Sequence, residues 1–171
     1  GGNRSTLTMS SGTQTIGPTK INGDLNVSGG TLNIKGYVWV TGNIRVSNTA
    51  VIQVDASLGA NGTIIIGDGT YNITNSAVLK GNGDPKSFLM VVISGNSNNQ
   101  VQIGNSAKND ILYAPNSQIQ ISNSSQFREV TAYELNIQNG AIVTYDQGLA
   151  SASFSSGPGG RWTVTAWQEL K

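Results

Sequence analysis

The sequence predicts an all-β protein, a right-handed parallel β-helix (β-solenoid) of about six three-strand rungs with a C-terminal capping segment. Apolar residues alternate with polar ones in units of only three to five residues, and Gly, Asn, Ser or Asp closes nearly every unit. These closing residues tolerate the left-handed backbone of a tight corner. A chain that turns a corner after each short strand, always in the same direction, forms a coil.

The alternating units recur along most of the chain. Helical spacing of apolar residues is absent, because Gly or Asn interrupts the chain every few residues. Strands this short make poor hairpins, so each is expected to pair with its equivalents in the rungs above and below. The units lie at residues 25–27, 32–34, 38–40, 44–46, 64–66, 71–73, 101–103, 119–121, 135–137 and 141–143.

Grouping the units in threes gives rungs that start at residues 64, 89, 111 and 130. The starts are 25, 22 and 19 residues apart, close to the roughly 20-to-30-residue repeat of a β-solenoid. Inward Ile, Val and Leu would then stack between rungs about 4.8 Å apart, with polar residues outside. An antiparallel sandwich is the alternative, but it predicts longer strands and clear two-residue turns, of which this sequence has few.

The length fits a single domain with three parts. Residues 1–17 are a polar lead-in whose first two glycines resemble a cloning remnant, residues 18–150 form the solenoid, and residues 151–171 form a C-terminal return or capping segment. The last part contains Trp162 and Trp167, which we expect to cover the final rung. Such a cap would protect the strand edges that the end of a coil exposes.

Composition excludes several classes of function. Ten Lys or Arg residues against nine Asp or Glu residues give no electrostatic basis for binding nucleic acid or an anionic membrane. The absence of Cys excludes disulfides and thiolate chemistry, and the absence of His removes the usual general base and transition-metal ligand. No apolar stretch is long enough for a transmembrane helix, and the N-terminus lacks a signal-peptide pattern. We expect neither a cofactor nor a metal site.

A glycosidase or lyase site on the coil would need paired acidic residues, because glycoside hydrolysis requires two carboxylates at a defined separation. Asp55 and Asp84 are 29 residues apart, and Asp84 and Asp110 are 26 apart, so they could stack on neighbouring rungs. Most of the Asp residues, however, adjoin Gly or Asn, where turn formation explains them. No catalytic residue is assigned, and a carbohydrate-active enzyme remains an alternative.

Exposed aromatic residues give the stronger indication of a binding site. If Val38 and Val40 point inward, Tyr37 and Trp39 point outward from the same strand. A Trp beside a Tyr on a rigid sheet face could contact a sugar ring or a partner protein. The alternative is that a loop or the N-terminal segment covers the pair. Tyr133 shares its parity with two apolar residues of the next unit and is therefore assigned to the core or to its corner.

Several segments resemble the C-terminal β-solenoid domain of bacterial type IV pilus assembly proteins, of the PilX-like, minor-pilin kind. They include Ile21-Asn-Gly-Asp-Leu-Asn-Val-Ser-Gly-Gly, Tyr37-Val-Trp-Val-Thr-Gly-Asn-Ile and, most specifically, Trp162-Thr-Val-Thr-Ala-Trp-Gln-Glu. The resemblance covers about residues 18 to 171 and implies an N-terminal pilin-like helix, absent from this chain, as the membrane anchor. It carries over no catalytic residue. Bactofilins share the Gly-Asn-Ile pieces.

The expected function is a non-catalytic extracellular module of a pilin-like or pilus-associated surface protein, used for structural or adhesive display. Its expected partners are other pilus or pilin-like subunits, or surface glycans, and its expected location is the cell surface. A self-assembling, bactofilin-like scaffold is the third possibility beside the enzyme.

Overall fold

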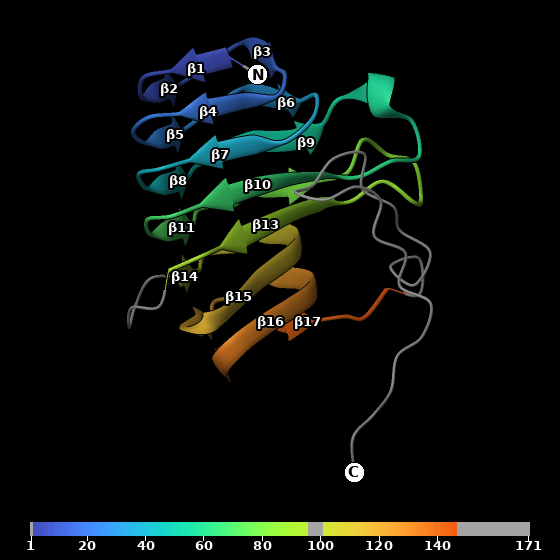
Figure 1. The fold of residues 1–171 in the computed structure, drawn as a ribbon. Coiled ribbons are helices and arrows are strands. Elements are labelled where there is room, and N and C mark those ends of the chain that lie inside the picture. The colour runs from blue at the N-terminus through green and yellow to red at the C-terminus, as the bar shows by residue number, and fades with distance from the viewer. Residues whose placement is uncertain (1, 96–100, 147–171) are drawn as a thin grey trace.

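The computed structural model of the protein describes residues 2–95 and 101–146 (Figure 1). Within these residues the chain forms 17 strands and one short 3-10 turn, η1 (Ala56–Leu58), and all the strand pairs are parallel. The strands are β1 (Gly2–Arg4), β2 (Leu7–Met9), β3 (Thr13–Ile16), β4 (Thr19–Ile21), β5 (Leu25–Val27), β6 (Thr31–Ile34), β7 (Val38–Val40), β8 (Ile44–Val46), β9 (Val51–Val54), β10 (Thr63–Gly67), β11 (Tyr71–Ile73), β12 (Val78–Lys80), β13 (Leu89–Ile93), β14 (Val101–Ile103), β15 (Lys108–Ile121), β16 (Gln126–Ile137) and β17 (Ile142–Val143).

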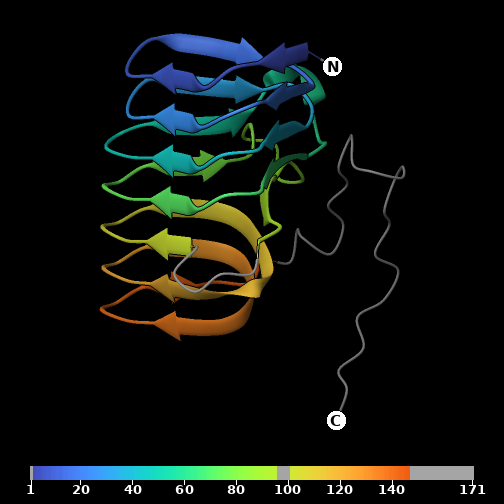
Figure 2. The ribbon, with the colours of Figure 1, turned by 60° about the vertical axis from the view of Figure 1, so that its left-hand side comes forward.

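The strands stack on three faces of a coil, one above another (Figure 2). The first face holds β1, β4, β7, β10 and β13, followed by the middle parts of β15 and β16. The second holds β2, β5, β8, β11, β14 and the ends of β15 and β16. The third holds β3, β6, β9, β12, the starts of β15 and β16, and β17.

The described residues therefore form seven turns, one more than the sequence predicts, and the predicted parallel β-helix is confirmed. In Figure 1 the strands in front run to the left and those behind run to the right as the chain descends, which is a right-handed coil. The predicted rung starts at residues 64, 89, 111 and 130 lie within one residue of equivalent positions, because Ile64 pairs with Met90, Met90 with Ile111, and Leu112 with Val130.

The extra turn lies at the N-terminus, and the prediction of a polar lead-in over residues 1–17 is wrong. Residues 2–16 form the first turn, with Gly2 opposite Thr19 and Leu7 opposite Leu25. Parallel pairing uses backbone groups, which a polar segment supplies as well as an apolar one. Met9 and Ile16 provide the inward side chains, at 7% and 1% exposure.

The last described turn is open to solvent. Leu135 and Ile137 are 39% and 47% exposed, whereas Ile119 and Ile121, their equivalents one turn earlier, are 2% and 0% exposed. The predicted capping segment 151–171, with Trp162 and Trp167, lies outside the described residues. Tyr133 is 78% exposed, which excludes the core and leaves the corner, the other position that the sequence allowed. It lies where the register between β15 and β16 shifts, and alternation does not carry across such a corner.

Four asparagines form a ladder at the corner between the second and third faces. Asn105 donates to Asn75, Asn123 to Asn105, and Asn139 to Asn123, at 3.1, 3.1 and 3.2 Å from Nδ2 to Oδ1. Their φ angles lie between 50° and 56°, the left-handed region that Asn tolerates better than most residues. The ladder ties four successive turns together through side chains. Its signal in the sequence is Asn followed by Ser or Gly and then Ala or Ser, at residues 74–77, 104–107, 122–125 and 138–141.

Candidate functional site

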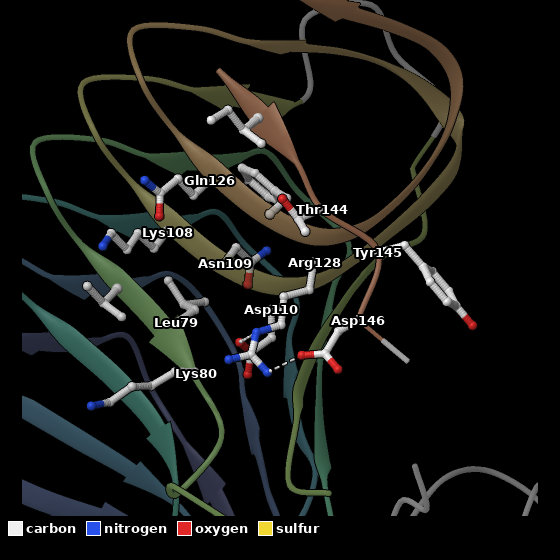
Figure 3. Close-up of a pocket in the computed structure, with 13 residues that line it drawn as sticks. Leu79, Lys80, Lys108, Asn109, Asp110, Gln126, Arg128, Thr144, Tyr145 and Asp146 are labelled. Atoms are coloured by element: carbon white, nitrogen blue, oxygen red, sulfur yellow. Dashed lines mark hydrogen bonds and ion pairs between the residues drawn. The ribbon is translucent and has the colours of Figure 1, made fainter. Parts of the chain in front are cut away.

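A groove of about 730 Å³ crosses the last turns of the third face (Figure 3). Four strands, β12, β15, β16 and β17, contribute side chains to its walls at corresponding positions on successive turns. One column runs through Val78, Lys108, Gln126 and Ile142. A second column lies two residues further along each strand, where the chain turns towards the first face; it contains Lys80, Asp110, Arg128 and Thr144.

Arg128 lies between two carboxylates at this corner (Figure 3). Its Nε is 3.4 Å from Asp110 Oδ1, and its Nη1 is 3.0 Å from Asp146 Oδ2. Its guanidinium carbon also lies 5.5 Å from the centre of the Phe88 ring, within the range of a cation–π contact. The Arg128 side chain is nevertheless 47% exposed, so part of its donor fork faces the solvent of the groove.

Asp110 is the buried member of this cluster, with a side chain only 8% exposed. Its Oδ2 accepts the backbone N–H groups of Gly81, at 2.6 Å, and of Leu89, at 3.3 Å. Burial raises the pKa of Asp110 above its ordinary value, and this effect outweighs the two hydrogen bonds and the nearby guanidinium, which lower it. The carboxylate therefore fastens both ends of the loop that joins β12 to β13.

The other charged residues of the groove are lysines. Lys80 and Lys108 are both exposed, and within the described part of the chain neither forms an ion pair or a side-chain hydrogen bond. With Arg128 they give three cations against the two carboxylates of Asp110 and Asp146. The groove is thus weakly positive, and its surplus charge lies at the Lys80–Lys108 end.

Asn109 places an unusual polar side chain in the core beneath the groove. The residue is only 3% exposed, and its side-chain Oδ1 and Nδ2 both lack a hydrogen-bond partner within the described residues. An unpaired buried amide costs on the order of 1–3 kcal/mol. It occupies an inward position between Leu79 and Phe127 on the neighbouring turns.

Three other Asp residues, Asp24, Asp55 and Asp84, accept hydrogen bonds at the corners of the coil. Asp55 accepts from the backbone N–H and the hydroxyl of Ser57, and these bonds lower the pKa of its carboxyl group. Asp84 accepts from the Lys86 N–H inside its own loop. Asp24 accepts from the Asn43 N–H and from Arg45, and both interactions lower its pKa. The carboxylate that converges with Asp110 is therefore Asp146, through Arg128.

The structure confirms that Tyr37 and Trp39 point outward, at 40% and 39% exposure, while Val38 and Val40 are fully buried. The Trp39 indole is already engaged on two sides. Its Nε1–H donates to Asp68 Oδ2 at 2.7 Å, and Lys20 Nζ lies 4.0 Å from the ring centre. A ligand that stacks on that ring face would have to displace the ammonium. Binding by this pair stays a prediction.

Two general features of the described residues bear on function. Among residues 2–95 and 101–146, no three acidic, His or Cys side chains come together as a metal site. No helix in this part of the chain is long and apolar enough to cross a membrane.

Comparison with known proteins gives one assignment. No curated protein and no solved structure matches the chain. One family model, described as a domain of unknown function (DUF7305), matches residues 2–152, which include all seven described turns of the coil. The match begins at the first turn, in agreement with the structure, which places residues 2–16 inside the coil. By this match the chain belongs to the DUF7305 family.

Proposed function

We propose that the chain is a non-catalytic module displayed at the cell surface by a pilin-like or pilus-associated protein, where it acts as a rigid structural or adhesive rod. The observation that carries this proposal is the way successive turns are joined. Backbone pairing on three faces, stacked apolar columns and the asparagine ladder all run along one axis. Such a rod holds outward side chains at fixed positions, as a display module requires.

The roles of the carboxylates favour a scaffold over an enzyme. Asp24, Asp55 and Asp84 accept hydrogen bonds from backbone N–H groups near their own corners. The best case for catalysis is Asp110 with Asp146, the two carboxylates that share Arg128 in the groove. However, Asp110 Oδ2 is taken up by two backbone N–H groups, which suits a structural role.

Self-assembly by end-to-end stacking is less well supported, because the two ends of the coil differ. The last described turn exposes Leu135, Ile137 and Ile142, whereas the first turn presents mainly Thr, Ser, Asn and Gln. Head-to-tail stacking would place the apolar end of one copy on the polar end of the next, so the exposed apolar side chains would gain fewer apolar contacts than they do between two turns inside the coil.

The pilus setting rests on the resemblance of residues 18 to 171 to pilus assembly proteins. Antibodies raised against the purified chain test it on intact cells that produce the full-length protein. We expect labelling of the surface, along pili, without permeabilisation. Labelling that appears only after the cells are opened would contradict the proposal.

The adhesive role of Tyr37 and Trp39 needs a separate test. A glycan array probed with the wild-type chain and with Trp39→Ala should show signals that the variant loses. Tyr133→Ala is the matched control, because it removes another exposed aromatic ring from a different turn. If every neutral-glycan signal survives Trp39→Ala, the pair is removed from the candidate sites.

A further inference from the structure

The groove of the third face presents one cationic side chain on each of three consecutive turns. Lys80 lies in β12, Lys108 on the next turn at the start of β15, and Arg128 one turn further in β16. Turns of a parallel coil are about 4.8 Å apart, so the three positions extend over about 10 Å along the axis. The cations therefore form a staggered row that follows the coil.

This row is only partly neutralised by the protein itself. Asp110 and Asp146 both contact Arg128, at the far end of the row. Lys80 and Lys108 have no acidic partner within residues 2–95 and 101–146. Two neighbouring unpaired ammonium groups on the wall of a groove favour an anionic ligand, and nearby walls of low dielectric strengthen that preference.

The uncharged lining suits a sugar chain better than a small inorganic anion. Gln126 and Thr144 are exposed beside the cations and can bond hydroxyl groups, both as donors and as acceptors. Tyr145, 58% exposed, provides an aromatic face at the end of the groove. A groove of about 730 Å³ is also far larger than an inorganic anion needs.

We propose that this groove binds a segment of an acidic polysaccharide, with acidic groups of the sugars on Lys80 and Lys108 and a sugar ring against Tyr145. Gln126 and Thr144 bond the sugar hydroxyls between these two ends. The proposal deepens the display function, on which its biological role rests, by naming the class of ligand. The binding itself depends only on the groove and is measured on the purified chain.

Isothermal titration of the 171-residue chain with a hexamer of galacturonic acid tests the proposal, with a neutral galactose hexamer and inorganic sulfate as comparison ligands. We expect the acidic hexamer to bind and the neutral hexamer to bind at least tenfold more weakly. Raising the salt from 50 to 500 mM should weaken binding of the acidic hexamer severalfold, because salt screens exposed charges.

A charge-matched pair of variants locates the site. Lys80→Gln/Lys108→Gln should weaken binding about tenfold. Lys35→Gln/Lys86→Gln removes two exposed lysines that do not line the groove and should leave binding unchanged. Circular dichroism of both variants confirms that the coil is intact.

Four outcomes would overturn the proposal. These are no binding of the acidic hexamer, equal binding of the neutral hexamer, equal losses in the two double variants, and full competition by sulfate at matched charge. The last outcome would indicate a site for small anions only. None of them bears on surface display, which the antibody labelling tests, and a failure of that labelling would leave the titration result standing.

Discussion

The side-chain amide of Asn123 donates to Asn105 Oδ1 at 3.1 Å and accepts from Asn139 at 3.2 Å, so one residue links three turns of the coil. Asn123 also holds a φ of 54°, a conformation that costs most residues about 1–2 kcal/mol. Its amide and its backbone can therefore be tested separately.

Asn123→Gly keeps the left-handed backbone and removes both ladder hydrogen bonds. We expect it to lower the free energy of unfolding by about 1–2 kcal/mol, at the usual net value of a hydrogen bond. Asn123→Ala should lose about 1 kcal/mol more, because alanine pays the cost of the positive φ. Urea denaturation of both variants measures the two effects. Equal losses would show that the ladder, and not the backbone conformation, accounts for the preference for Asn.

Tyr71 offers a case in which removing a polar group should stabilise the fold. The residue is fully buried, and its hydroxyl has no hydrogen-bond partner within the described residues. Burial also raises the pKa of the phenol far above its usual range. Tyr71→Phe should therefore raise the free energy of unfolding by about 1 kcal/mol, since an unpaired buried hydroxyl is costly.

Tyr113→Phe is the control for this substitution, because Tyr113 is 43% exposed and its hydroxyl is expected to be hydrated. Thermal unfolding of the two variants should show an increase in Tm for Tyr71→Phe alone. A loss of stability on removal of the Tyr71 hydroxyl would mean that this group has a bound water or another partner.

Asp110 should make part of the stability depend on pH. Its pKa is raised in the folded protein by burial, whereas the unfolded chain titrates near the ordinary value of 3.8. The folded state thus holds the proton more tightly, so the contribution of Asp110 is greatest below pH 3.8 and is lost as the pH rises through the folded-state pKa. Arg128 and Asp146, the charged groups nearest to it, act in opposite directions on this pKa.

Comparison with Asp110→Asn isolates this contribution. Urea denaturation at intervals from pH 3 to 7 should show wild type losing stability relative to the variant as the pH rises above about 4. Asp24 and Asp55, whose pKa values are lowered, have the opposite dependence but are common to both proteins. A constant difference across this range would contradict the raised pKa.

Trp39 should stabilise the stacking of three successive turns. It contacts Lys20 on the turn before and Asp68 on the turn after. A cation–π contact is worth about 0.5–1 kcal/mol at an exposed site, and a hydrogen bond to a charged acceptor about 1.5 kcal/mol or more. Trp39→Phe should therefore cost about 1–2 kcal/mol, mostly through the lost N–H.

Asp68→Ala in the Trp39→Phe background tests whether the two residues act together. If they do, the second substitution should add less than it does in the wild-type chain. Asp68 also accepts from the Ser94 hydroxyl at 2.9 Å, so a residual cost is expected in both backgrounds. Fully additive losses, measured by urea denaturation, would show that the two side chains are not coupled.

The alternation of apolar and polar residues within each short strand explains which parts of this fold were predictable. A strand such as Val38–Val40 shows its two buried valines and its outward Trp39 through alternation alone, because successive side chains point to opposite sides. Rung starts follow from the spacing of such units. The first turn was missed because Gly2–Arg4 has no apolar residue, and it pairs with β4 through backbone groups and the Thr19 hydroxyl, which donates to the Gly2 carbonyl at 2.8 Å.

The residues that line the charged groove could not be predicted from the alternation of apolar and polar residues. Lys80, Asp110 and Arg128 are 30 and 18 residues apart, and the corners between them differ in length. Only the register of β12, β15 and β16 brings these residues to one wall. A shift of a single residue in that register would move each of them to the other side of the sheet.

The sequence by itself determined the class of fold, the coil and its rung spacing, because alternation and corner residues are local properties of the chain. The tertiary structure alone decided which side chains meet: Asn123 with Asn105, Trp39 with Asp68, and Arg128 with both Asp110 and Asp146. Those contacts depend on the number of residues in each turn. That number varies along this chain, and it sets which side chains face each other only once the strands have paired.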